Sequence, residues 1–86
     1  GIPIKLNAKK TSNEREAYLL IRKRKESKPN YYYLSKSGNL KEAAKNLYNT
    51  LRKIKNNKHK SIVVEKIPNI GFGKVIVDRL TRASKL

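Results

Sequence analysis

The sequence contains no cysteine, so neither a disulfide framework nor a thiolate metal site can form. No apolar run approaches the ~18 residues that a membrane-spanning helix needs, and no signal peptide is visible. Methionine is also absent and the chain begins at Gly1, which is typical of a fragment or a processed product. The sequence therefore leaves open whether a targeting peptide or a preceding domain belongs to the full protein. The 86 residues themselves predict a single domain with a small core.

Groups that could carry catalysis are scarce. The one histidine, His59, lies between Lys58 and Lys60, and we expect it to be a solvated loop residue. A general acid and base must share one pocket, but the six acidic residues are scattered along the chain. We therefore expect no catalytic residue, no metal site and no cofactor. Surface charge compensation is the interpretation for the acids with basic neighbours in sequence, Glu14, Glu16, Glu26 and Glu65.

Basic residues greatly outnumber these acids. The chain has 22 Lys and Arg against 6 Asp and Glu, a net charge of +16. A compact chain with this charge repels itself, and a polyphosphate relieves the repulsion while releasing condensed counterions. We expect RNA as the partner, either rRNA or tRNA, together with other proteins of a ribonucleoprotein. We expect no membrane partner, because no long amphipathic stretch presents bulky aromatics on one face. A merely solvated basic surface is the alternative.

Two basic runs without an acidic interruption carry the RNA hypothesis. One, residues 22–25, follows a predicted strand, and the other, residues 53–60, covers the end of a predicted helix and the next loop. Such side chains bind phosphates and position RNA without reading its bases. Lys74 would add a single phosphate contact. The predicted RNA-binding residues are Arg22, Lys23, Arg24, Lys25, Lys53, Lys55, Lys58, Lys60 and Lys74.

Four segments have the pattern of β-strands. Ile2, Ile4 and Leu6 alternate with Pro3 and Lys5, and the proline favours the edge of a sheet. The other three segments are rich in aromatic and β-branched residues, which favour strands. They span residues 18–22, 31–34 and 61–65.

The clearest element is a helix that begins after Asn39. Glu42 follows the possible cap by three positions, as in a capping box, and asparagine favours the helix end near residues 56–57. Flanking strands make this helix part of a βαβ unit with a right-handed crossover and parallel strands. The helix has one apolar stripe, formed by Leu40, Ala44, Leu47, Leu51 and Ile54.

A second helix is predicted over residues 74–85. Its inner stripe is Ile76, Leu80 and Ala83, with Val77 beside it. Asp78 precedes Arg82 by four positions, so these two residues and Arg79 are candidates for a local ion-pair network or a functional contact. The resulting fold class is α/β, a small Rossmann-like sheet of three or four strands with two helices.

Two further motifs have both a structural and a functional interpretation. Gly71 and Gly73 precede the second helix, whose free N–H groups could bind phosphate. Their spacing matches neither nucleotide-binding fingerprint, so we expect a tight turn that needs positive φ and allows close helix packing. Tyr31 and Tyr33 share one face of their strand and Tyr32 the other. They could stack bases, but helices on both faces would bury all three, and we expect them in the core.

Several of these segments form longer signatures. One combines Ser-Gly-Asn-Leu at 37–40, Glu-Ala-Ala at 42–44, Asn-Leu-Tyr at 46–48 and Leu-Arg at 51–52. Another combines Ile-Pro-Asn-Ile-Gly-Phe-Gly at 67–73 with Val-Asp-Arg-Leu-Thr-Arg-Ala-Ser at 77–84. In order and spacing they resemble the C-terminal domain of the threonylcarbamoyl-AMP synthases. Residues 2–4 and 6–8 resemble the segment that follows the interdomain linker of that family.

The resemblance implies a Rossmann-like accessory domain spanning residues 1–86, without catalytic machinery. The family makes threonylcarbamoyl-adenylate for tRNA modification, and its chemistry belongs to an N-terminal YrdC-like domain that nothing in this chain resembles. Ile70, Phe72 and Val75 depart from the family pattern, as does the high charge. We therefore expect a non-catalytic RNA-binding module, such as a mitochondrial ribosomal protein derived from this domain. The alternative is the regulatory C-terminal domain of a synthase, in bacterial cytoplasm or mitochondria.

Overall fold

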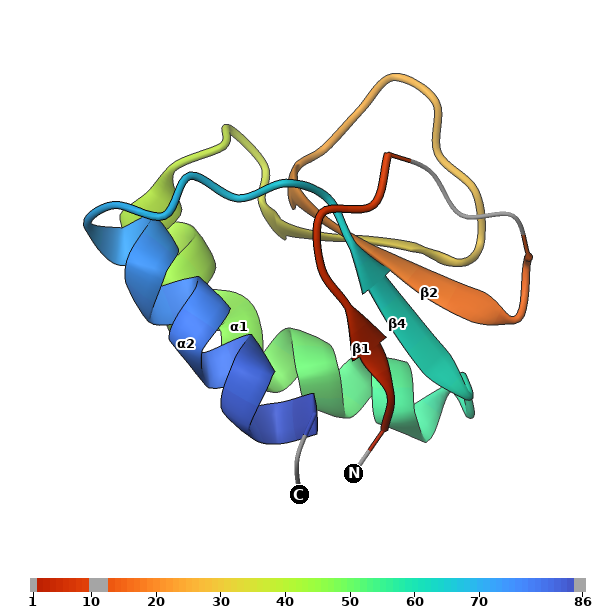
Figure 1. Ribbon diagram of the computed structural model, residues 1–86. Coiled ribbons are helices and arrows are strands. Elements are labelled where there is room, and N and C mark those ends of the chain that lie inside the picture. Colours follow the sequence, from red (N-terminus) through yellow and green to blue (C-terminus); the bar gives the residue numbers. More distant parts are fainter. Residues whose placement is uncertain (1, 10–12, 85–86) are drawn as a thin grey trace.

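The computed structural model describes residues 2–9 and 13–84, which form one parallel sheet with helices packed against it (Figure 1). Its elements are β1 (Ile4–Lys5), β2 (Glu16–Arg22), β3 (Tyr31–Ser35), α1 (Leu40–Asn56), β4 (Ser61–Val64) and α2 (Phe72–Ser84). The strands lie in the order β1-β4-β2-β3 and every neighbouring pair is parallel. The predicted α/β class is therefore confirmed. In its βαβ unit, α1 joins β3 to β4, and β2 lies between these two strands.

Position in the sheet explains the composition of each strand. The inner strands β2 and β4 are buried on both faces, which is why residues 17–20 and 62–64 are continuous apolar runs instead of alternating ones. The predicted edge position of the first strand is confirmed, since β1 pairs only with β4 among the described strands. Pro3 contributes its carbonyl oxygen, which accepts a hydrogen bond of 2.9 Å from the Ile62 N–H. The missing N–H of proline is harmless at this edge.

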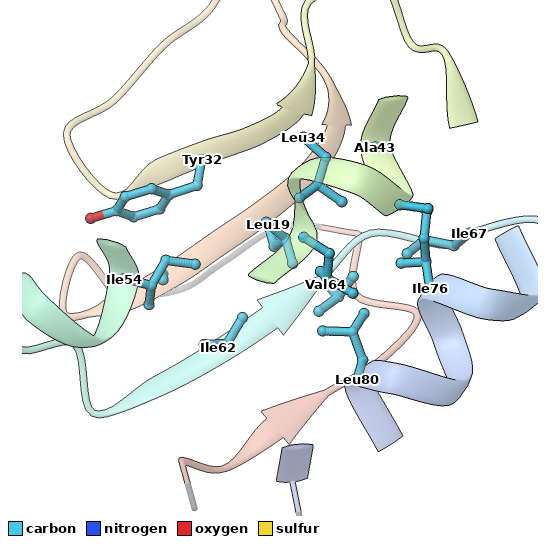
Figure 2. Packing of buried hydrophobic residues seen from close by; sticks show 13 residues of the cluster. Leu19, Tyr32, Leu34, Ala43, Ile54, Ile62, Val64, Ile67, Ile76 and Leu80 are labelled. Carbon is cyan, nitrogen blue, oxygen red and sulfur yellow. The ribbon is translucent and has the colours of Figure 1, made fainter. Parts of the chain in front are cut away.

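Both helices cover the same face of the sheet, and the main core lies between them and the strands (Figure 2). Leu19, Leu34 and Val64 project from the strands toward this layer. The opposite face has a smaller cluster of Tyr18, Leu20 and Val63, against which Ala8 and Tyr31 pack. No described helix covers that second face; the connections 6–9 and 23–30 run on that side (Figure 1). The main core consists of Ala17, Leu19, Tyr32, Leu34, Ala43, Ala44, Leu47, Ile54, Ile62, Val64, Ile67, Ile76 and Leu80.

Helix α1 begins and ends close to the predicted positions. Asn39 caps it, since its Oδ1 accepts from the Glu42 N–H at 2.9 Å. The return contact of a capping box is made differently from the prediction, because the Asn39 N–H donates to Ser35 Oγ at 3.0 Å. Asn57 is the C-terminal cap but has an ordinary φ of −83°. The left-handed residue of this turn is Lys58, with φ 61°.

Helix α2 begins at Phe72, two residues before the predicted start at Lys74. Gly73 therefore lies inside its first turn and only Gly71, with φ 54°, has the positive φ predicted for this turn. A Cβ at Gly73 would lie 1.9 Å from the Pro68 carbonyl oxygen, so the missing side chain allows the close packing predicted for this helix. The predicted last residue of the helix, at position 85, lies outside the described residues.

Candidate functional site

The nine predicted RNA-binding side chains are all exposed, but they lie at two separate edges of the sheet. Because the strands are parallel, β2 and β4 finish at the same end of the sheet, here called the carboxyl edge, and the first turn of α2 lies there. We call Arg22, Lys23, Arg24, Lys25 and Lys74 the carboxyl-edge cluster. Helix α1 runs back to the other edge, where the loop to β4 begins. We call Lys53, Lys55, Lys58 and Lys60 the amino-edge cluster.

Arg24 of the carboxyl-edge cluster is held in place by an acid. Its Nη2 donates to Glu65 Oε2 at 2.8 Å, and Glu65 Oε1 accepts from the Ile21 N–H. Burial lowers the pKa of Arg24, but the hydrogen bond to Glu65 and the interactions with Tyr18 together outweigh burial and leave that pKa raised. Glu65, expected to be surface charge compensation, thus also fixes the end of β2. Arg24 is the most strongly positioned cation of the cluster.

Cations of the connection after β2 lie against tyrosine rings. The Lys23 ammonium is 5.7 Å from the centroid of Tyr33, and the Lys28 ammonium is 5.9 Å from that of Tyr31. Arg24 lies 5.4 Å from the centroid of Tyr18, whose hydroxyl donates to the Lys9 carbonyl oxygen at 2.7 Å. On the second face of the sheet, the cationic side chains of the loop 23–30 therefore lie against the tyrosine rings, where a helix would otherwise pack.

The tyrosine run is only partly in the core, contrary to our expectation. Tyr32 is buried under α1, whereas Tyr31 is half-buried and Tyr33 is 44% exposed on the opposite face. The predicted alternation of the three rings is confirmed, but the expected burial of all three is wrong. The cause is the topology, because both helices lie on the Tyr32 side. The connection between β2 and β3 has eight residues, fewer than the dozen or so that a helical crossover between parallel strands needs. This short connection is the sequence feature that indicates an uncovered second face.

His59 lies in the loop between α1 and β4, as predicted, but it is half-buried and both of its ring nitrogens have partners in the protein, so the expectation of a solvated side chain is wrong. Its Nδ1 lies 3.0 Å from the Arg15 carbonyl oxygen, and its Nε2 lies 2.8 Å from the Tyr32 hydroxyl. A carbonyl only accepts, so in the neutral ring Nδ1 carries the proton. The Tyr32 hydroxyl then donates to Nε2 and accepts from Asn57 Nδ2 at 2.8 Å. This chain joins the start of β3 to the loop after α1.

The start of α2 uses its own N–H groups internally. The Gly73 N–H donates to the Ile70 carbonyl oxygen at 3.0 Å, and the Lys74 N–H approaches the same oxygen at 3.4 Å. These groups are therefore less available to a phosphate than the free N–H groups of an open helix terminus. The geometry favours the predicted structural role of the Gly-Phe-Gly turn, and leaves the Lys74 side chain as the group that could reach a phosphate.

Of the polar residues of α2, Arg79 makes a contact with α1. Among the described residues, no ion pair joins Asp78 to Arg82, so the predicted pairing is wrong. Arg79 instead donates toward the Ala44 carbonyl oxygen of α1 at 3.5 Å. A structural contact between the helices therefore accounts for Arg79.

Other kinds of site are less developed within residues 2–9 and 13–84. No group of three or more His, Asp or Glu in this part of the chain could hold a metal ion. No described helix is long and apolar enough to cross a membrane. A cavity of about 130 Å³ opens at the carboxyl edge, lined by Leu6, Asn7, Glu65, Ile67, Asn69 and Val77. Its one carboxylate belongs to Glu65, which already binds Arg24 and the Ile21 N–H.

The parallel sheet, the helices on one of its faces and the βαβ crossover through α1 together make up a small Rossmann-like α/β domain. The family model described as "Threonylcarbamoyl-AMP synthase, C-terminal domain" matches residues 3–85. The chain therefore belongs to this family, and the resemblance noted in the two signature sequences is confirmed. Neither the curated proteins nor the solved structures that were compared with it yield a match.

Proposed function

We propose that this domain is a non-catalytic module that binds RNA through the phosphate backbone. The observation that carries the proposal is the exposure of all nine predicted cations in a chain with a net charge of +16. Apart from Arg24, none of these nine forms an ion pair with another described residue. Each cation that contacts a phosphate releases condensed counterions, so binding is strong at low salt and sequence-independent.

The test measures the affinity of the whole chain for a fluorescently labelled single-stranded RNA by anisotropy over a series of salt concentrations. We expect log K to fall linearly with log salt concentration, with a slope of about −0.7 for each phosphate contacted. A slope close to zero, or no binding at about 50 mM salt, would contradict the proposal.

Matched variants tell the two edges apart. One replaces three cations of the carboxyl-edge cluster by glutamine, at Arg22, Lys23 and Lys25, and retains Arg24 because it holds Glu65. The other makes the same change at Lys53, Lys55 and Lys60 of the amino-edge cluster. Both variants remove three charges. If one edge forms a specific interface, the salt slope should become less steep in one variant than in the other. Equal and small changes of slope in both variants would indicate unspecific attraction and contradict the residue assignment.

The setting of this module has two candidates. The first is a structural role in a ribosome, which the high positive charge of the chain favours. The second is the regulatory C-terminal domain of a threonylcarbamoyl-AMP synthase in tRNA modification, favoured by the family match over residues 3–85. Isolation of the native polypeptide distinguishes them. Co-sedimentation with ribosomal particles supports the first setting, and a polypeptide that synthesises threonylcarbamoyl-adenylate supports the second.

A further inference from the structure

The exposed side chain of Tyr33 has surroundings that differ from those of the buried tyrosines. It lies on β3, the outer strand of the sheet on the side away from β1, and its ring faces the side without helices. Its partner across the strand pair is Leu20, which is buried. The ring is thus supported from below by the sheet, while 44% of the residue remains open to solvent.

One cation lies over this ring, and a second projects from the same face of the sheet. The Lys23 ammonium lies 5.7 Å from its centroid. Arg22 follows Leu20 by two residues on β2, so it points to the same face of the sheet. Its aliphatic stem lies next to Gly38, where a Cβ would be 3.4 Å from both Cβ and Cδ of Arg22. Gly38 itself has φ 86°, a conformation that other residues rarely adopt, and this turn packs against the stem of Arg22.

The electrostatic balance at this position is positive. Glu65, the acid bound to the same connection, already accepts hydrogen bonds from Arg24 and from the Ile21 N–H. A shallow groove of about 330 Å³, lined in part by Tyr33, lies between β3 and α1. Half of its lining residues are lysines or asparagines, namely Lys36, Lys53, Asn46 and Asn49, and one, Glu42, is an acid.

An aromatic ring with neighbouring cations suits one ligand class. Unpaired bases stack on exposed aromatic rings, and cations beside the ring bind the phosphates that flank the base. We propose that Tyr33 stacks on a base of single-stranded RNA, while Arg22 and Lys23 bind the adjacent phosphates. The groove beside β3 accommodates the next nucleotide. This inference rests on the proposed RNA-binding function and adds to it a preference for single strands, because a duplex does not offer the faces of its bases.

The experiment compares three variants of the whole chain by anisotropy with a labelled oligouridylate, an abasic strand of equal length and a duplex. Tyr33→Ala should weaken oligouridylate binding by about tenfold and leave abasic-strand binding unchanged. Tyr33→Phe retains the ring and should bind oligouridylate like the original chain. Tyr48→Ala is the matched control, since Tyr48 is 68% exposed on α1 with Arg52 5.7 Å from its ring. It should bind all three ligands normally.

The outcomes separate the two proposals. Salt-dependent binding that Tyr33→Ala does not change would overturn the stacking site and leave the RNA-binding function intact. If the chain bound none of the three ligands, both the stacking site and the RNA-binding function would be overturned. Equal losses in Tyr33→Ala and Tyr48→Ala would also overturn the stacking site, because they would indicate an unspecific effect of removing tyrosine. Circular dichroism of each variant shows that the fold is retained before binding is measured.

Discussion

At the scale of single residues, Gly73 provides the sharpest prediction. In an ordinary helix, replacing glycine by alanine stabilises the fold by about 1 kcal/mol. Here the new Cβ would meet the Pro68 carbonyl oxygen at 1.9 Å, and a backbone atom cannot rotate away. We expect Gly73→Ala to lower the free energy of unfolding by about 1–3 kcal/mol, as overpacking does. Urea denaturation monitored by circular dichroism measures this difference.

Gly71→Asn is the control for this substitution. Gly71 has φ 54° and no heavy atom lies within 4 Å of a Cβ built there. Asparagine tolerates this left-handed conformation better than most residues, so the variant should lose less stability than Gly73→Ala. Should Gly73→Ala be as stable as the original chain, α2 would not depend on its close contact with Pro68.

At the scale of elements, the start of α1 depends on two side chains outside the helix. Asn39 accepts from the Glu42 N–H, and Ser35 accepts from the Asn39 N–H. Asn39→Ala leaves the Glu42 N–H without its partner and should cost about 1 kcal/mol of stability. Asn39→Asp should retain the cap and add a favourable negative charge at the helix start. Urea denaturation of both variants gives the free energies of unfolding.

The same chemical change inside the helix should have the opposite sign. Asn49 is exposed in the middle of α1, where alanine is the better helix former. We therefore expect Asn49→Ala to stabilise the chain slightly. Two equal destabilisations would show that the amide of Asn39 has no special role as a cap.

The elements also show where prediction from sequence ends. The stripe of α1 and the alternation of Tyr31, Tyr32 and Tyr33 follow from local periodicity, and both are confirmed. The exposure of Tyr33 depends on which face the helices cover, and that is a property of the whole topology. The role of His59 depends on Arg15 and Tyr32, which are distant in sequence and meet it only through strand pairing. Local patterns do not contain such contacts.

At the scale of the whole molecule, parallel strand direction decides how the charge is distributed. The two basic runs look alike in sequence, yet one follows the end of β2 and the other precedes the start of β4. They therefore lie at opposite edges of the sheet. The carboxyl-edge cluster places Lys23 over the exposed ring of Tyr33, whereas the amino-edge cluster contributes Lys53 to the groove beside that ring. The sequence could nominate both clusters, but only the fold distinguishes them.

The total charge leads to a prediction about stability. The folded chain confines a net charge of +16 within a radius of gyration of 11.6 Å, against about 29 Å for an unfolded chain of this length. The Debye length falls from about 30 Å at 0.01 M salt to about 10 Å at 0.1 M. Added salt therefore relieves repulsion more in the folded state than in the unfolded state. We expect Tm to rise with sodium chloride, by about 4–8 °C for each 1 kcal/mol of relieved repulsion.

The sign of this response is diagnostic, because exposed ion pairs such as Arg24–Glu65 weaken as salt is added. A fold stabilised mainly by ion pairs would show Tm falling with salt, which would contradict the prediction. Glutamate in place of Lys53, Lys55 and Lys60 lowers the net charge and should reduce the salt response. If RNA binds to the phosphate sites proposed above, it should raise Tm most at low salt, where both the repulsion and the binding are strongest. Thermal denaturation with and without the oligouridylate measures both effects on one chain.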